Sequence, residues 1–235
     1  MSEILLSPAD LAPALPGAPL AGIDLSPKRR QALDAATDLF MAHGYGAVSM
    51  DAVARRANVS KATLYAHFPS KEVLFATIVR ERGLTNQLDS TLFPEHVTDL
   101  RAALETIGRR VMRFMLQERT LAIYRVAIAE AARFPELGRA FFDNGPSKFC
   151  TWGERWIARQ QAAGLVRQAD LGVATHQFMA LLRSGVFLRA SLALPPAPGE
   201  AEIEATVRAA VDTWLRAFGT GSAATPGFAA PKDCA

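Results

Sequence analysis

The sequence has few cysteines and no long uninterrupted apolar run. Only Cys150 and Cys234 occur among its 235 residues, so we expect no disulfide framework and a reducing, cytoplasmic compartment. Arg, Glu or Pro interrupts every long hydrophobic stretch, which argues against a membrane span. No basic segment precedes the first apolar residues, so we do not expect a signal peptide.

Signatures of catalysis and of metal binding are also missing from the sequence. It contains no Gly-x-Ser-x-Gly motif, no HExxH motif and no phosphate-binding loop. The four histidines are scattered, and no group of His, Cys or carboxylate side chains has the spacing of a metal site. We therefore expect neither an enzyme, nor a metal ion, nor a cofactor.

The composition is that of a folded protein with a basic front segment. Half of the residues are hydrophobic and 21% are charged, which excludes disorder along the whole length. Residues 26–82 hold nine Lys or Arg and five acidic residues, whereas the formal net charge of the whole chain is only +3. A polyanion, if one binds, should therefore bind at the front.

The chain shows helical periodicity almost throughout, and no segment alternates long enough to predict a strand, so we expect an all-α fold. We expect a flexible Pro/Ala-rich extension over 1–25, a three-helix domain over 26–72, a larger helical domain over 73–219 and a disordered tail over 220–235. The fourth helix should run from Lys71 to about residue 91.

Two short helices joined by a tight turn are predicted near residue 60. Ser49 and Ser60 are suitable N-cap residues for the two helices, and Asn58 tolerates the left-handed conformation that the turn requires. This is the layout of a helix-turn-helix, whose second helix lies in the major groove of DNA. Lys61 and Thr63 occupy the positions that reach base edges.

Neighbouring side chains are candidates for contacts with phosphate. Tyr65 and His67 can donate to phosphate oxygens. Lys71 and Ser49 each lie at a helix N-terminus, where anions are favoured. For each side chain a purely structural role stays open. An exposed lysine is usually only solvated, Tyr65 could be half-buried in packing, and His67 could be an ordinary surface or core histidine.

The motif GYGAVSMDAVA over 44–54, followed by VSKATLYAHFPSKE over 59–72, resembles the TetR/AcrR family of bacterial transcriptional regulators. The resemblance implies an all-helical homodimer that binds operator DNA and a small effector and is usually a repressor. Matched by position, groove contacts fall on Lys61, Ala62 and Thr63. Backbone contacts fall on Ser49, Tyr65, His67 and Lys71. Asn58 replaces a common Gly and Ala66 a common aromatic residue, which leaves the base preference open.

The stretch IYRVAIAEAARFPEL over 123–137, with its continuation to Leu188, is similar to the AefR-like subgroup of that family. The subgroup has the same dimer and effector plan, and it implies no particular ligand.

The last two predicted helices, about 171–193 and 200–218, each carry a broad apolar face. If two copies pair through these helices, a four-helix bundle with two-fold symmetry results. The apolar residues proposed for this seam are Ala174, Phe178, Leu181, Leu182, Gly185, Leu188, Ile203, Val207, Ala210, Val211, Trp214, Leu215 and Phe218. The alternative is that these helices form the core of a single chain.

The effector cavity is expected between the helices around 111–134 and 146–182. Large apolar side chains with a few polar ones should line it and take a small, largely apolar compound, although many of them could instead be core. The candidates are Met112, Met115, Tyr124, Arg125, Ile128, Phe149, Trp152, Trp156, His176 and Phe178. Cys150 could be a redox switch, but a buried inert thiol is the simpler interpretation.

Two functions fit these patterns. The first is a ligand-responsive repressor that binds a palindromic operator as a dimer. The second is a helical enzyme or lipid carrier with a basic N-terminal subdomain. No catalytic motif supports this second function. DNA binding separates the two.

Overall fold

The computed structural model describes residues 26–85 and 88–220. The expected extension over 1–25 lies outside the described residues, as does the expected tail apart from Thr220. Thr220 belongs to the folded part, because its backbone N–H donates to the Leu165 carbonyl.

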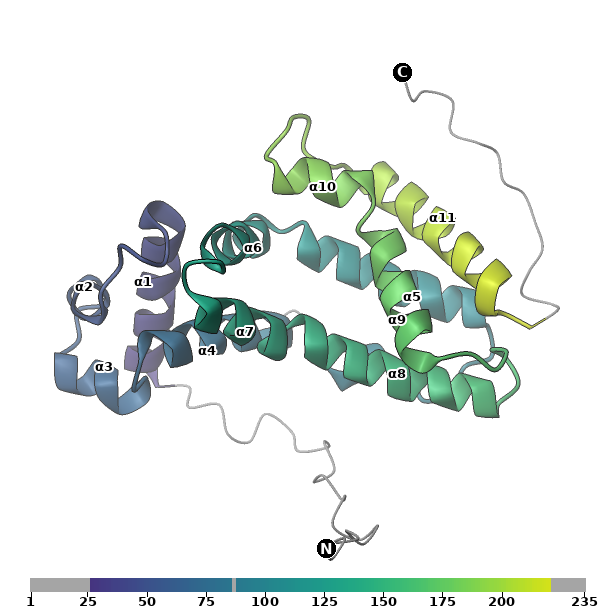
Figure 1. Cartoon of the computed structure of the whole chain (residues 1–235), viewed down its shortest axis with the longest axis horizontal. Helices are drawn as coiled ribbons and strands as arrows, with labels where there is room; N and C mark the ends of the chain where they lie inside the picture. Colours follow the sequence, from purple (N-terminus) through teal and green to yellow (C-terminus); the bar gives the residue numbers. More distant parts are fainter. Residues whose placement is uncertain (1–25, 86–87, 221–235) are drawn as a thin grey trace, which may run out of the picture.

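The described residues form an all-α fold with one isolated β-bridge, between Val166 and Gly219. Figure 1 shows an elongated molecule with α1, α2 and α3 at one end and α11 at the other. The helices are α1 (Pro27–His43), α2 (Met50–Arg56), α3 (Lys61–His67), α4 (Lys71–Thr85), the short 3-10 helix Ser90–Leu92, α5 (Leu100–Met115), α6 (Glu118–Glu130), α7 (Pro135–Asn144), α8 (Pro146–Ala162), α9 (Leu171–Leu182), α10 (Gly185–Ser191) and α11 (Glu200–Phe218). No helix within the described ranges has the length and apolar character needed to cross a membrane.

Local residues determine where the N-terminal helices begin and end. The Ser26 hydroxyl accepts a hydrogen bond from the Arg29 N–H at the start of α1, and Gly44 ends that helix with φ +77°. Asn58 adopts φ +52° in the turn between α2 and α3. These residues supply a cap or a left-handed backbone at low cost, so they determine the local path of the chain.

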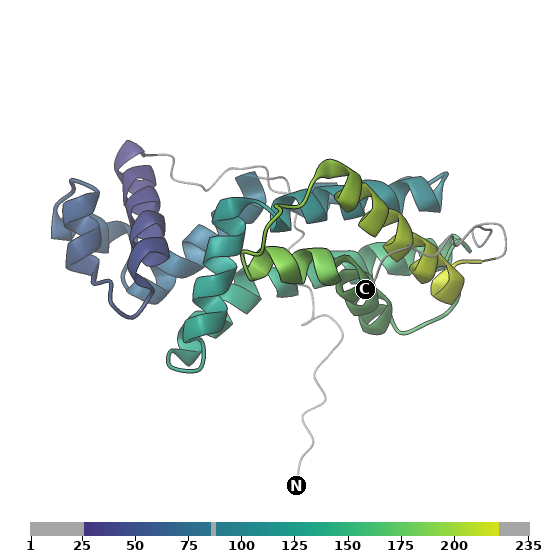
Figure 2. The same cartoon turned by 90° about the horizontal axis from the view of Figure 1, so that it is seen from above.

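Two hydrophobic clusters form the core. One joins α1 to α4 with side chains of α6 and α7, among them Ile123, Ala127 and Leu137. The other joins α5 with α8 to α11 around Trp156 and Trp214. Helices α6 and α7 thus contribute to the packing of the N-terminal end, as Figure 2 shows from above.

Two predicted helices are shorter than expected. α4 ends at Thr85 rather than near residue 91. The segment 171–193 is not one helix, because α9 ends at Leu182 and α10 begins at Gly185. Ser184 and Gly185 are both weaker helix formers than alanine or leucine, and Ser184 adopts an extended backbone between the two helices.

The predicted dimer seam is wrong for ten of its thirteen residues. Of the side chains proposed for it, ten are buried within a single chain: Ala174, Phe178, Leu182, Ile203, Val207, Ala210, Val211, Trp214, Leu215 and Phe218. Trp214 illustrates the reason, since its indole N–H donates to the Ala174 carbonyl at 2.8 Å and so joins α11 to α9. Arg101 of α5 also pairs with Asp212 of α11. The apolar face of α11 therefore covers α5 and α9 of its own chain.

Candidate functional site

The first candidate site is the exposed face of α3 at the end of the molecule. The Ser60 hydroxyl accepts from the Thr63 N–H at 3.0 Å and starts the helix. Leu64 and Phe68 are buried and anchor α3 on the N-terminal core. The opposite face is accessible, because Lys61, Ala62 and Tyr65 are exposed and Thr63 is half-buried. Side chains proposed to read DNA thus share one accessible face.

Lys61 has a partner in the helix-turn-helix. Its ammonium lies 2.5 Å from the Asp51 carboxylate at the start of α2, while its side chain is 65% exposed. The pair tethers α3 to α2 and partly neutralises the cation that was expected to face DNA. The sequence alone did not predict a partner for Lys61. The position of Asp51, in the first turn after the Ser49 cap, is the feature that could have identified it.

The remaining phosphate candidates differ in where they lie. The Ser49 hydroxyl is exposed and accepts from the Ala52 N–H at 3.2 Å, which caps α2. The His67 ring is half-buried beside Phe68. Tyr65 is 46% exposed and free of the core packing that the alternative interpretation required. Ser49 and Tyr65 are therefore accessible, and His67 only in part.

The geometry contradicts the expected use of the Lys71 cation. The Lys71 ammonium donates to the carbonyl oxygens of Tyr45, at 2.9 Å, and Val48, at 3.0 Å. It also lies 4.2 Å from the centre of the Tyr45 ring. Burial lowers the pKa of this ammonium. Its side chain thus holds the turn between α1 and α2 rather than projecting toward a phosphate.

The same turn is held from the other side by α6. The Glu130 carboxylate accepts from the backbone N–H of Tyr45 at 2.5 Å and of Gly46 at 2.7 Å. A Cβ atom at Gly46 would lie 2.9 Å from Glu130 Oε2, and Gly44 combines a similar approach with its positive φ. Two glycines therefore let the carboxylate reach the backbone. The sequence does not predict this role of Glu130, since it does not show which backbone faces the side chain.

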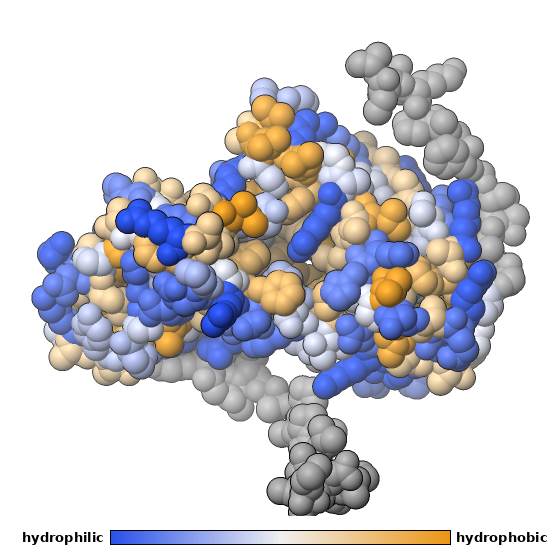
Figure 3. Space-filling model, in the orientation of Figure 1, coloured by the Kyte–Doolittle hydropathy of each residue, from blue (hydrophilic) through white to orange (hydrophobic). Residues whose placement is uncertain are grey.

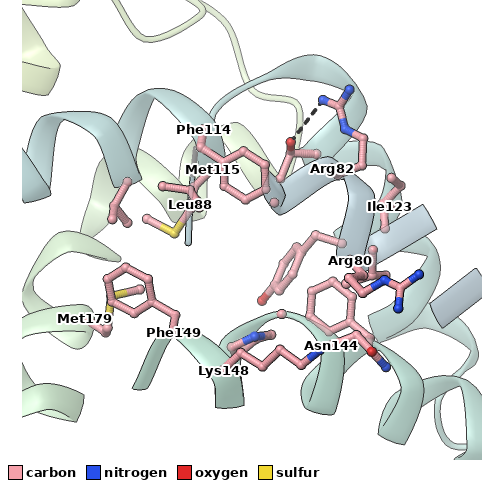
Figure 4. Close-up of a pocket in the computed structure, with 18 of the residues that line it drawn as sticks. Arg80, Arg82, Leu88, Phe114, Met115, Ile123, Asn144, Lys148, Phe149 and Met179 are labelled. Carbon is pink, nitrogen blue, oxygen red and sulfur yellow. Dashed lines mark hydrogen bonds between the residues drawn. The ribbon is translucent and has the colours of Figure 1, made fainter. Parts of the chain in front are cut away.

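The second candidate site is a partly open cavity of about 210 Å³ lined by residues between α4 and α10. Figure 3 shows the surface hollowed near the middle of the molecule, with apolar side chains in the hollow. Figure 4 shows Leu88, Phe149 and Met179 on one side of the cavity and Arg80 and Asn144 on the other. A compound with a large apolar part fits such a lining.

Four of the ten residues proposed for the effector cavity line it: Met115, Tyr124, Phe149 and Trp152. Two others, Trp156 and Phe178, line a separate void of about 20 Å³. Met112 is fully buried in the core. Helical periodicity identifies inward side chains, but it does not distinguish a side chain beside a cavity from one packed against other side chains.

The last three candidates face elsewhere. Arg125 donates to the carbonyl oxygens of Ala190, at 2.7 Å, and Ser191, at 2.8 Å, so it caps the end of α10. Ile128 is 62% exposed, and His176 is exposed as well. Sequence reasoning in turn missed several lining residues, notably Arg80, Arg82, Lys148, Met179 and Arg183. Nothing in the periodicity marks the end of α4 as a cavity wall.

Comparisons with known proteins match both parts of the chain. Residues 32–78 match the bacterial regulatory proteins of the tetR family. Residues 102–220, half of the chain, match the C-terminal domain of AefR-like transcriptional repressors.

Sequence relatives and solved structures agree with these matches. The transcriptional activator FasR of Mycolicibacterium smegmatis is 38% identical over 84 residues, which cover 33% of this chain and 37% of that protein. A putative TetR-family regulator from Mesorhizobium loti is 27% identical, with a TM-score of 0.71 over 82% of this chain and 97% of the other. The flavonoid-responsive regulator FrrA is 33% identical, with a TM-score of 0.69 over the same shares.

The relatives are named as transcriptional regulators and not as enzymes. The N-terminal match covers the helix-turn-helix described above, and the C-terminal match covers most of the cavity-bearing helices. The chain therefore belongs to the TetR family of bacterial transcriptional regulators, with an AefR-like C-terminal domain.

Proposed function

We propose that the protein is a ligand-responsive repressor that binds a palindromic operator as a homodimer in the cytoplasm. The observation that carries this proposal is the accessible face of α3, whose Lys61, Ala62 and Tyr65 are exposed while Leu64 anchors the helix. A helix presented in this way fits the major groove, which is about 12 Å wide.

In this proposal the side chains divide into readers of bases and positioning contacts. Lys61, Ala62 and Thr63 face base edges near the start of α3. Tyr65, His67 and the N-terminus of α2 at Ser49 contact phosphates, which fix the register of the protein on the duplex. On binding, Lys61 exchanges its contact with Asp51 for a contact with DNA.

Two copies place two reading helices about 34 Å apart, one turn of DNA. Because the inward faces of α9 and α11 are filled within one chain, the copies meet through the outward faces. Exposed side chains there include Val173 on α9 and Ala205 and Ala209 on α11, with Leu188 on α10. A charged residue at a packed two-fold contact is costly, so Ala209→Glu should give monomers by light scattering, whereas Ala102→Glu on the exposed side of α5 should not.

The effector acts on DNA binding through helices that contact both sites. α6 lines the cavity with Ile123 and Tyr124 and ends at Glu130, which binds the turn between α1 and α2. α4 lines the cavity near its end and begins at Lys71, which binds the same turn. A compound that binds a second arrangement of α4 and α6 more tightly reduces the population that binds DNA. The size of the effect is set by the ratio of the compound's affinities for the two arrangements. A nearly complete shift takes about 5.5 kcal/mol of differential binding.

The direct test is binding of the purified protein to DNA from upstream of its own gene. We expect a specific complex at nanomolar protein, and a log affinity that falls linearly with log salt concentration because phosphate contacts release counterions. A folded protein that shows no preference for any segment of that DNA would contradict the proposal and favour a helical enzyme or carrier.

A further inference from the structure

The cavity has an uneven distribution of charge. Of the 21 described residues that line it, four are cationic, namely Arg80, Arg82, Lys148 and Arg183, and none is acidic. The chain as a whole holds 26 Lys or Arg and 23 Asp or Glu, so a lining with cations alone departs from the composition of the chain.

Carboxylates elsewhere in the described ranges do not neutralise most of these cations. No ion pair to a carboxylate involves Arg80, Lys148 or Arg183 there, although nine other arginines or lysines form such pairs: Arg29, Arg56, Lys61, Arg101, Arg109, Arg113, Arg119, Arg125 and Arg189. Arg183 instead lies 5.8 Å from the centre of the Phe187 ring. The positive charge at the cavity is thus available to a ligand.

Arg82 lies on α4, as Arg80 does, and hydrogen bonds hold its side chain in place. Its guanidinium donates to Gln117 at 2.8 Å and to Thr120 at 3.4 Å, the latter drawn in Figure 4. Burial lowers the pKa of this guanidinium, and the nearby positive charge of Arg119 lowers it further. A negative charge placed beside Arg82 would therefore be stabilised.

Most of the lining residues are apolar, and two of the cations lie at the rim of the cavity. In Figure 4, Leu88, Phe149 and Met179 occupy the side opposite Arg80 and Asn144, and Phe114 and Met115 continue that apolar wall. Arg80 and Lys148 are exposed, so the cations form the rim of the cavity, while Met115 and Phe149 are buried. The cavity is therefore apolar inside, with cations at its rim.

We propose that the effector is an anionic amphiphile, a compound with an apolar body and a single carboxylate or similar acid group. The inference rests on the proposed effector function of this cavity. The body packs among Phe114, Met115, Phe149 and Met179, and the acid group binds Arg80, Arg82 and Lys148 at the rim. Because Arg80 and Arg82 belong to α4 and Lys148 to α8, the acid group bridges the helix that begins at Lys71 to the rest of the cavity wall.

Decanoate is the probe, with 1-decanol as the uncharged control and decyltrimethylammonium as the cationic one. Calorimetry should show decanoate binding about tenfold more tightly than decanol at low salt, since hydrogen bonds to charged groups outweigh neutral ones. This advantage should shrink as salt screens the rim. Affinity should rise from hexanoate to decanoate by about fourfold for each further buried methylene.

The double variant Arg80→Gln with Lys148→Met tests the rim. It should lower decanoate affinity about tenfold and leave decanol affinity within about twofold, because only the charged contact is lost. The matched control is Arg139→Gln with Arg155→Gln, which removes two exposed cations that do not line the cavity. This control should bind decanoate as the unaltered protein does.

Trp152 lines the cavity and reports the location of the probe. Decanoate should change the tryptophan emission of the unaltered protein, and Trp152→Phe should remove most of this change. Equal affinities for decanoate and decanol, equal losses in both double variants, or no binding of decanoate would overturn the inference. If decanoate binds as described but the protein binds no DNA, the ligand class stands and the proposed regulatory function fails.

Discussion

The Glu130 carboxylate lies 2.7 Å from the backbone nitrogen of Gly46, although 84 positions separate the two residues in the sequence. The contact joins the end of α6 to the turn that precedes α2. The Lys71 ammonium binds the Tyr45 and Val48 carbonyls of the same turn. The orientation of the DNA-binding helices thus depends on side chains of α4 and α6, both of which also line the cavity.

We expect Gly46→Ala to destabilise the protein by about 1 to 3 kcal/mol, the usual range for overpacking a filled site. The new Cβ would lie 2.9 Å from both Glu130 Oε2 and the Phe134 ring. Urea unfolding measures the effect, with Gly185→Ala as the control, since no atom lies within 4 Å of a Cβ built there. Equal unfolding midpoints for the two variants would contradict this packing.

Replacing Glu130 with Gln should loosen the turn without creating a cavity. Each carboxylate oxygen accepts from one of the two N–H groups, and the amide replaces one oxygen with a donor, so the N–H that faces it loses its partner. Loss of a hydrogen bond to a charged group costs about 1.5 to 3 kcal/mol, which predicts hydrogen exchange at these amides roughly tenfold faster or more. Glu154→Gln on α8 is the control. Unchanged exchange at both amides would show that the carboxylate does not hold the turn.

Asp51→Asn should strengthen DNA binding. The substitution releases the Lys61 ammonium from its 2.5 Å contact with Asp51, and it removes a negative charge next to the DNA. Exposed pairs are worth about 0.2 to 1 kcal/mol, so we expect an affinity gain of up to about fivefold at low salt, and less at high salt. Asp143→Asn on α7 changes the net charge equally, outside the helix-turn-helix. If both variants gain the same affinity, the effect is one of overall charge.

Cys150 should react slowly with alkylating reagents at neutral pH. Burial raises the pKa of its thiol, and the negative charge of Glu154 raises it further. A raised pKa leaves less thiolate at a given pH, and the thiolate is the nucleophile. In a Cys234→Ser background the alkylation rate should rise with pH around a midpoint above that of the same thiol in urea. A midpoint below the urea value would contradict an inert thiol and favour a redox role for Cys150.

Much of the N-terminal fold could be predicted because its signals are local. Ser49 and Ser60 cap helices in the structure as predicted, and Asn58 takes the left-handed conformation. Each of these residues acts within four positions of itself, so the sequence nearby contains the cause.

The longer-range features could not be predicted, because an amphipathic pattern shows that a face is buried and not what buries it. Trp214 and Val207 were assigned to a dimer seam but lie in the core of one chain. Lys71 has the charge for a phosphate contact, yet its ammonium donates to two backbone carbonyl oxygens that lie 23 and 26 positions earlier in the sequence. The cavity likewise depends on Arg80 and Met179, which only the packing of separate helices brings together.

The most direct measurement is a titration of fluorescent DNA from upstream of the gene with the unaltered protein, Tyr65→Ala, Lys61→Ala and the control Phe142→Ala, whose aromatic ring is 55% exposed on α7. We predict nanomolar binding with a steep salt dependence. Tyr65→Ala should weaken it similarly on all sequences, Lys61→Ala should also relax base preference, and Phe142→Ala should bind normally. A folded dimer in which neither α3 substitution alters DNA binding would contradict the placement of α3 in the groove.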